Sequence, residues 1–203
     1  MTIAFVLLWL AAVAPTASPR AGPAPCTCAS APATNGWCEA HRVGYVAGVA
    51  IRSSVLYETL DAHGHAVDPQ TFECVACQAA IRTSGFCETH RIGFEDSLAY
   101  FSRLTYELAR ARRAPAGAIA CPVCRMHAVA GGWCDACRIG RLGRFVFDDK
   151  QALLRVLREM EILRAANEAS ARCEGCAAAM VTDTQCPYCR ITYQGGRALA
   201  PAP

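Results

Sequence analysis

Fourteen cysteines fall into four groups whose spacing could hold metal ions. Nine residues separate the second cysteine of each group from the third, and a fourth Cys or His follows after two more residues. Two residues between ligands let a tight turn present both side chains to one ion, and a second such pair completes the tetrahedron that Zn²⁺ prefers. The predicted metal ligands are Cys26, Cys28, Cys38 and His41; Cys74, Cys77, Cys87 and His90; Cys121, Cys124, Cys134 and Cys137; and Cys173, Cys176, Cys186 and Cys189.

An even number of cysteines also allows seven disulfides. In the first two groups, however, His41 and His90 stand where the last two groups have cysteine. His and Cys are both ligands of Zn²⁺, but His cannot form a disulfide. The pattern therefore favours about four Zn²⁺ ions per chain. The disulfide framework stays open as the alternative, because an oxidising compartment would favour it.

The groups belong to a longer repeat. A shift of 49 residues takes the segment 36–38 (GWC) onto 85–87 (GFC), and it takes 41–45 (HRVGY) onto 90–94 (HRIGF). The third group keeps the same two segments in part, and the fourth keeps only the Cys-Arg-Ile that ends the pattern. A degenerate terminal copy is typical of a short array of modules. The sequence therefore predicts an internally duplicated, cysteine-rich chain.

The third and fourth groups, CPVC…GWCDAC and CEGC…CPYC, resemble short zinc-ribbon modules, which occur singly or as double zinc ribbons. The resemblance covers about 17 residues per copy. It implies two knuckles on a small β-hairpin around one structural Zn²⁺, and it implies little about biological role. The chain departs from that pattern in its short nine-residue spacer, in the missing Gly after most knuckles, and in the Cys26-Thr27-Cys28 spacing, which predicts a weaker first site.

The spacers between the second and third cysteines carry turn residues, which predicts a small hairpin in each copy. These turn residues are Asn35-Gly36, Ser84-Gly85, Gly131-Gly132 and Asp183-Thr184. An aromatic residue precedes the third cysteine in the first three groups, as Trp37, Phe86 and Trp133. Such a residue could cover the metal or could simply pack in a core, and both interpretations stay open.

An arginine follows the fourth ligand in every copy. The four arginines are Arg42, Arg91, Arg138 and Arg190. We expect the guanidinium groups to offset the charge of the thiolates and to donate to sulfur. Fourteen thiolates and four Zn²⁺ ions would lower the formal net charge by 6, from +3 to about −3. Nucleic acid is therefore not the expected partner.

Amphipathic helices are predicted after each of the first three groups. In the second, Leu98, Phe101, Leu104 and Leu108 recur at helical spacing, and in the third, Leu153, Val156, Leu157, Met160 and Leu163 do so. Asp148 with Gln151 resembles a capping box at the start of the third helix. The predicted fold class is a small, metal-stabilised α+β array of zinc-ribbon units joined by helices. The predicted divisions are residues 1–25 (leader and Pro-rich linker), 26–70, 71–114, 115–170 and 171–194 (modules 1 to 4) and 195–203 (flexible tail).

The amino terminus carries an apolar run of 12 residues over 3–14, followed by Pro15, Pro19, Pro23 and Pro25. That length suits a signal peptide or a short membrane anchor better than a spanning helix of about 20 residues. We expect an exported protein of the periplasm or cell envelope, or a membrane-anchored one. A buried N-terminal helix is the alternative, and the protein would then be cytoplasmic.

Catalytic patterns are sparse. Cys186-Pro-Tyr-Cys189 is similar to a glutaredoxin-like dithiol motif, but its expected βαβ setting is missing from the pattern upstream. Asp61, His63, His65 and Asp68 form a loop cluster that could bind a labile metal or could be solvated. We therefore expect a non-enzymatic, zinc-binding scaffold with protein partners. A metal-handling protein of the envelope is the first alternative, and a cytosolic zinc finger that binds nucleic acid is the second.

Overall fold

The computed structural model describes residues 26–114, 117 and 119–199, so the prediction of a signal or anchor over 3–14 lies outside the described residues. In module 1 the elements are α1 (Ala31–Thr34), β1 (Trp37–Cys38), β2 (Val43–Val46), β3 (Val49–Ile51) and α2 (Ser54–Leu60). Before and within module 2 they are β4 (His65–Ala66), the 3-10 helix η1 (Pro69–Thr71), α3 (Val75–Arg82), β5 (Phe86–Cys87), β6 (Ile92–Glu95), β7 (Leu98–Tyr100) and α4 (Arg103–Arg110).

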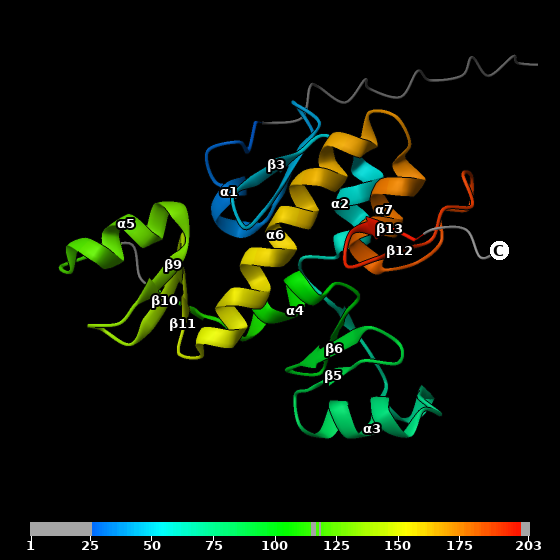
Figure 1. The fold of residues 1–203 in the computed structure, drawn as a ribbon, viewed down its shortest axis with the longest axis horizontal. Helices are drawn as coiled ribbons and strands as arrows, with labels where there is room; N and C mark the ends of the chain where they lie inside the picture. The colour runs from blue at the N-terminus through cyan, green and yellow to red at the C-terminus, as the bar shows by residue number, and fades with distance from the viewer. Residues whose placement is uncertain (1–25, 115–116, 118, 200–203) are drawn as a thin grey trace, which may run out of the picture.

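The same order recurs in the second half of the chain (Figure 1). Module 3 contains β8 (Arg112–Arg113), α5 (Pro122–Ala130), β9 (Gly132–Cys134), β10 (Ile139–Leu142), β11 (Phe145–Phe147) and α6 (Lys150–Ser170). Module 4 contains α7 (Glu174–Thr182), β12 (Tyr193–Gln194) and β13 (Arg197–Ala198). The result is a small mixed α/β fold in which every sheet is antiparallel.

The spacer between the second and third cysteines is helical, so the hairpin predicted there is wrong. In modules 2 to 4 it forms most of α3, α5 and α7, and the predicted turn residues lie where these helices end. Asn35, Ser84, Gly131 and Asp183 all adopt positive φ, between 48° and 75°. A residue with positive φ ends a helix because it turns the chain away from the helix axis. The predicted turn residues therefore do turn the chain, but they do so at the end of a helix rather than within a hairpin.

The hairpin of each module lies after the fourth ligand instead. Strands β2 and β3 of module 1 are joined by Ala47-Gly48, and β6 and β7 of module 2 by Asp96-Ser97, with both central residues at positive φ. Gly195-Gly196 joins β12 and β13 in the same way. This is the twist that two-residue hairpins require. Residues 195–198 therefore belong to a hairpin, and the predicted flexible tail was wrong for them.

Two strands cross the predicted module boundaries. His65 of β4 lies in the range assigned to module 1, yet it pairs with Ala99 in β7 of module 2. Likewise Arg113 of β8 pairs with Phe145 in β11 of module 3. Each of these sheets thus has four strands, and its fourth strand is the segment that enters the module.

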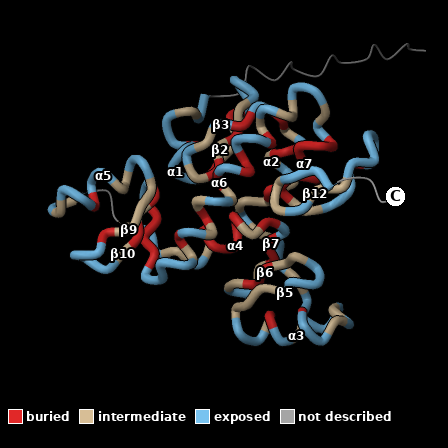
Figure 2. The backbone as a smooth tube through the Cα atoms, viewed as in Figure 1, coloured by how far each residue is buried: buried red, intermediate tan, exposed pale blue. Residues whose placement is uncertain are grey.

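The helices that follow the hairpins meet in one shared core. The 21-residue helix α6 packs against α2, α4 and α7 as well as against its own sheet. The core contains Val46, Ile51, Leu56 and Leu60 from module 1, Leu104 and Leu108 from module 2, and Leu153, Val156, Met160 and Leu163 from α6. Figure 2 shows the buried positions gathered where these helices converge. The helix–hairpin ends of modules 2 and 3 project away from that centre (Figure 1).

Two details of the helical predictions need correction. Helix α4 begins at Arg103, so Leu98 lies in β7 and Phe101 precedes the helix. The N-cap of α6 is Asp149, which accepts hydrogen bonds from the backbone of Gln151 and Ala152, whereas the sequence suggested Asp148. All five apolar positions predicted for the third helix do lie in α6.

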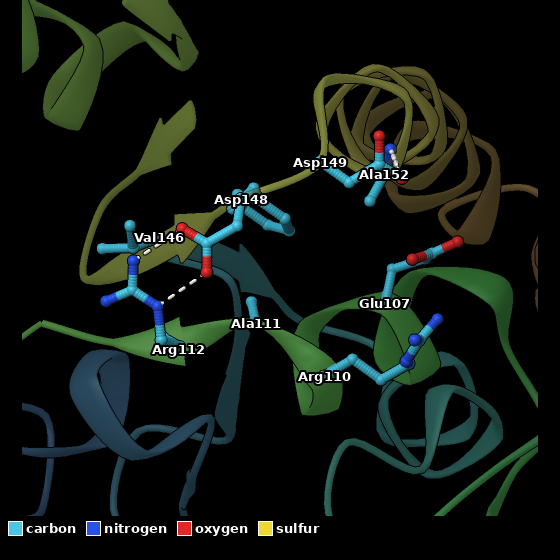
Figure 3. Close-up of a pocket in the computed structure, with 9 residues that line it drawn as sticks. Glu107, Arg110, Ala111, Arg112, Val146, Asp148, Asp149 and Ala152 are labelled. Carbon is cyan, nitrogen blue, oxygen red and sulfur yellow. Dashed lines mark hydrogen bonds and ion pairs between the residues drawn. The ribbon is translucent and has the colours of Figure 1, made fainter. Parts of the chain in front are cut away.

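The start of α6 forms a junction with module 2 (Figure 3). Asp148 accepts two hydrogen bonds from Arg112, at 2.8 and 2.7 Å, which ties β8 to the segment before α6. A cleft of about 190 Å³ lies beside this pair, between the end of α4 and the start of α6. Glu107 on its wall is 2% exposed and accepts a 2.6 Å hydrogen bond from Arg155. The polar groups of the cleft thus join modules 2 and 3. Within the described part of the chain, no helix is both long enough and apolar enough to span a bilayer.

Candidate metal centres

All sixteen predicted side chains come together as four clusters of four. Within each cluster the ligand atoms lie within 4.8 Å of one another. We call them site 1 (Cys26, Cys28, Cys38, His41), site 2 (Cys74, Cys77, Cys87, His90), site 3 (Cys121, Cys124, Cys134, Cys137) and site 4 (Cys173, Cys176, Cys186, Cys189). Each cluster consists of the four residues of a single sequence group, so each site is built by one module.

The distances in these clusters fit a tetrahedral ion. With Zn–S near 2.3 Å and Zn–N near 2.0 Å, two sulfurs should lie about 3.8 Å apart, and a sulfur should lie about 3.5 Å from a nitrogen. Sγ atoms are separated by 3.9 Å in Cys121–Cys134 and by 3.8 Å in Cys173–Cys186. The Cys77 Sγ lies 3.3 Å from His90 Nδ1. A disulfide requires about 2.05 Å, and all fourteen cysteines, which lie in the described ranges, are free.

Secondary structure positions the ligands in the same way in modules 2 to 4. The first cysteine, Cys74, Cys121 or Cys173, is the N-cap of α3, α5 or α7, and the second lies in the first turn of that helix. In modules 2 and 3 the third cysteine ends a strand, and the fourth ligand lies in the turn before the next strand. The second and third ligands are buried and the fourth is exposed. A helix N-terminus stabilises a thiolate because unpaired backbone N–H groups point toward it.

The thiols within one site ionise at very different pH. Hydrogen bonding from the backbone N–H of Cys77 lowers the pKa of Cys74 to about 7, whereas burial raises the pKa of Cys77 to about 12. In site 3 the backbone N–H of Cys124 lowers the pKa of Cys121 to about 7, and the neighbouring thiols raise the pKa of Cys137 to about 12. Four thiolates can share one cluster only when a cation neutralises them. The geometry thus suits a bound cation.

Site 1 has three cysteines and one histidine, as site 2 does, but the secondary structure around them differs. Helix α1 has only four residues and begins at Ala31, after Cys28 rather than after Cys26. Pro32 explains the late start, since proline fits only the first turn of a helix. His41 Nδ1 lies 3.3 to 3.5 Å from the three sulfurs, and this contact lowers the pKa of Cys38 to about 5. Both Cys26 and His41 are exposed.

The four arginines after the fourth ligand share a backbone conformation. Arg42, Arg91, Arg138 and Arg190 have φ of 48°, 58°, 54° and 59°. This left-handed region is the one that glycine favours, so arginine occupies a backbone position that suits glycine better. Within the described residues, no hydrogen bond joins these side chains to sulfur, and only Arg91 forms ion pairs, with Glu88 at 3.9 Å and Asp183 at 2.6 Å. The predicted donation to sulfur is therefore not found, and nothing in the structure explains arginine at the other three positions.

The aromatic residue before the third cysteine packs against the following helix. Trp37 lies 5.2 Å from Tyr57 of α2, and Phe86 lies 5.4 Å from Tyr106 of α4, measured between ring centroids. Trp133 packs against the shared core. Of the two interpretations left open by the sequence, these contacts support core packing.

Three glycines allow these helices to approach, and sequence reasoning did not single them out. A Cβ placed on Gly44, Gly93 or Gly140 would collide with Tyr57, Tyr106 or Leu153 of the following helix. The tyrosines also donate hydrogen bonds across the module, Tyr57 to the Asn35 carbonyl at 2.7 Å and Tyr106 to the Ser84 carbonyl at 2.9 Å. Both bonds span 22 residues. The repeated Gly and Tyr at constant spacing were the available signal.

Among the described residues, the candidate dithiol pairs and the histidine cluster of the loop do not form the geometry that their predicted chemistry requires. Cys186 and Cys189 lie in a turn rather than at a helix start. Cys121 and Cys124, whose Cys-Pro-Val-Cys sequence is similar to the same dithiol motif, do begin a helix, but the nearest preceding strand, β8, belongs to an antiparallel sheet. His65 pairs with Asp61 at 2.5 Å, and among the described residues His63 and Asp68 do not join them in a metal-sized cluster.

Comparisons with known proteins do not place this chain. A scan against models of protein families, a search of curated proteins and a search of solved structures each found no match. The zinc-ribbon resemblance therefore rests on the ligand pattern alone. The structure itself establishes four cysteine-rich sites that could hold metal ions in a small mixed α/β fold.

Proposed function

We propose that this chain is a zinc-binding, non-enzymatic scaffold built from four zinc-ribbon-like modules, which presents its surface to protein partners. One observation carries the proposal: sixteen Cys and His side chains form four clusters of four, in each of which the ligand atoms lie within 4.8 Å of one another. Thiolate and imidazole ligands favour Zn²⁺ over Mg²⁺ or Ca²⁺, which prefer oxygen. Four protein ligands also leave no open position for a substrate, which is typical of structural zinc.

The ions would stabilise the peripheral parts of the fold. Modules 2 and 3 project their helix–hairpin ends from the shared core (Figure 1), and the apolar cluster of module 2 is small and includes its own ligands Cys77 and Cys87. Structural zinc contributes on the order of 10 kcal/mol per site. Ion binding would therefore hold these ends in place as a surface for other proteins.

The location we propose is the cell envelope, because the apolar run over 3–14 has the length of a signal peptide or short anchor. Residues 3–14 would then be removed or would tether the chain to the membrane. Loading with four Zn²⁺ ions would make the protein mildly acidic, so we do not propose nucleic acid as a partner.

A second candidate function is metal handling, that is, capture or delivery of Zn²⁺ or a softer thiophilic ion. The observation that favours it is the exposure of the fourth ligand at every site. Structural ions resist mild chelators, whereas a carrier must release its ions. The rate at which a mild chelator removes the metal separates the two candidates.

The decisive experiment is anaerobic purification of the full chain with determination of bound metal and free thiols. We expect near four Zn²⁺ ions per chain and thiols that react only after chelation. Cys173→Ser is the matched variant, and it should lower the metal content by one ion without affecting sites 1 to 3. A metal-free protein with seven disulfides would overturn the proposal.

A further inference from the structure

Site 1 holds its first two cysteines differently from the other sites. In modules 2 to 4 the first cysteine caps a helix of eight or nine residues, and the second cysteine lies inside it. In module 1 both Cys26 and Cys28 precede α1, whose four residues start at Ala31. Site 1 thus lacks the helix start that carries the first two ligands in every other module.

Site 1 is also more open to water. Two of its four ligands, Cys26 and His41, are exposed, whereas sites 2 to 4 each expose only the fourth ligand. Only Cys38 is buried in site 1, while the other sites bury two ligands. A competing chelator can therefore reach site 1 from the side of both exposed ligands.

The fold of module 1 depends little on its own ligands. Its hairpin and α2 contribute Val46, Ile51, Leu56 and Leu60 to the shared core, each 0% exposed. Two hydrogen bonds add to this attachment, from Ser53 to Glu174 at 2.8 Å and from Asn167 to the Ala50 carbonyl at 3.1 Å. The hairpin would therefore stay in place without an ion at site 1.

Sites 2 and 4 differ from site 1 in that their ligands belong to apolar clusters of their own, although α7 of module 4 also packs against α6. Cys77 and Cys87 belong to the apolar cluster of module 2, and Cys176 and Cys186 belong to that of module 4. Removing an ion from these sites would leave buried thiolates that must take up protons or rearrange, so release is coupled to local unfolding. Site 3 shares the helix cap and the two buried ligands.

We propose that site 1 is an exchangeable Zn²⁺ site, which loses and regains its ion while sites 2 to 4 stay loaded and the fold persists. The proposal rests on the zinc-binding function proposed above. It makes the chain a scaffold with one accessible metal position, available to a protein or small thiol that accepts or supplies Zn²⁺.

The test uses the zinc-loaded full chain under anaerobic conditions. A mild excess of EDTA is added, and the released Zn²⁺, the far-ultraviolet circular dichroism and the labelling of cysteines by N-ethylmaleimide are followed together. We expect one ion per chain to leave about 10- to 100-fold faster than the other three, because losing the groups that support the ligands lowers metal affinity by about that factor. The dichroism should stay unchanged, and Cys26 and Cys28 should be labelled first.

Matched variants assign the fast ion. Cys26→Ser should abolish the fast phase and leave three slow ions, whereas Cys74→Ser, at the equivalent place in site 2, should keep the fast phase and leave two slow ions. Release of all four ions at one rate, or first labelling at Cys74 or Cys121, would overturn the proposal while leaving zinc binding intact. A chain that binds no zinc would instead refute the proposed function. Because labelling uses the native sequence, the result does not depend on how the variants fold.

Discussion

Adding a single methyl group at Gly93 should push a helix off its sheet. A Cβ at this position would overlap the Tyr106 ring and would lie 2.6 Å from the Tyr106 Cβ. The nearest atom, Tyr106 Cγ, would lie at 2.2 Å, and two carbon atoms approach comfortably only to about 3.5 Å, so in Gly93→Ala helix α4 must move by about 1.3 Å. The same movement would lengthen the 2.9 Å hydrogen bond from Tyr106 to the Ser84 carbonyl.

The magnitude follows from these two effects. Overpacking a well-filled core costs about 1–3 kcal/mol, and losing a hydrogen bond costs about 1 kcal/mol. We therefore expect Gly93→Ala to lower the free energy of unfolding by about 2–4 kcal/mol. For a chain of this size that corresponds to a fall in Tm of about 4–16 °C. Module 4 supports the interpretation, because among residues 119–199 no helix follows its hairpin and Thr192 stands at the equivalent position.

The assay is thermal and urea unfolding of the zinc-loaded chain, with metal content measured in parallel. Gly117→Ala is the matched control, since a Cβ there would meet no atom within 4 Å. Gly44→Ala should repeat the effect through Tyr57, which occupies the equivalent place in module 1. If Gly93→Ala were as stable as Gly117→Ala, within about 0.5 kcal/mol, the helix would not be held by this close approach.

Three further substitutions probe individual charged side chains of the fold. Arg155→Leu should lower the free energy of unfolding by about 2 kcal/mol, because it leaves the buried Glu107 without its 2.6 Å partner. Glu159→Gln should stabilise the protein at pH 7: burial raises the pKa of Glu159 above its ordinary value of 4.5, so its charged form is disfavoured in the folded state. That gain should vanish below about pH 4, where Glu159 is protonated both folded and unfolded. Asp183→Ala should cost about 1–2 kcal/mol, since it removes the acceptor of the 2.7 Å bond from the Gly195 backbone.

Each of these expectations has its own control. Glu107→Gln combined with Arg155→Leu should be less harmful than Arg155→Leu alone, and equal losses would exclude an uncompensated charge as the cause. For Glu159→Gln, a stability difference that stays constant from pH 4 to 7 would contradict the titration. Asp183→Asn keeps the acceptor for Gly195 but loses the charge that faces Arg91, so it should fall between Asp183→Ala and the native chain.

The membership of the four Cys/His clusters could be predicted from the sequence because it depends on residue type and short spacing. Nine-residue intervals place the paired cysteines at one point whether the spacer is a hairpin or a helix. Predicting a hairpin for the helical spacer therefore did not change which residues were predicted to cluster. The Ala-rich sequence of α3 favours a helix, whereas Ser84-Gly85 is typical of a turn. A left-handed residue ends a helix as readily as it closes a hairpin.

Packing between modules could not be predicted in the same way. The apolar stripe of α6 indicates a buried face, but periodicity does not say which helix covers it. The pairing of β4 and β8 with the next module was also hidden, because His65-Ala66 and Arg112-Arg113 carry no strand pattern of their own. These strands form because tertiary contacts bring them to the edge of an existing sheet.

The position of α6 late in the chain affects how the protein is made. Helix α2 ends at Leu60, but its main partners in α6 and α7 are synthesised only after residue 150. At about 5–20 residues per second, roughly 110 residues and about 5–20 s separate the end of α2 from the end of α6. Through that interval the nascent chain displays the apolar side of α2, and later that of α4 as well. A ribosome-bound intermediate that stops before α6 should therefore be the form that a chaperone recognises.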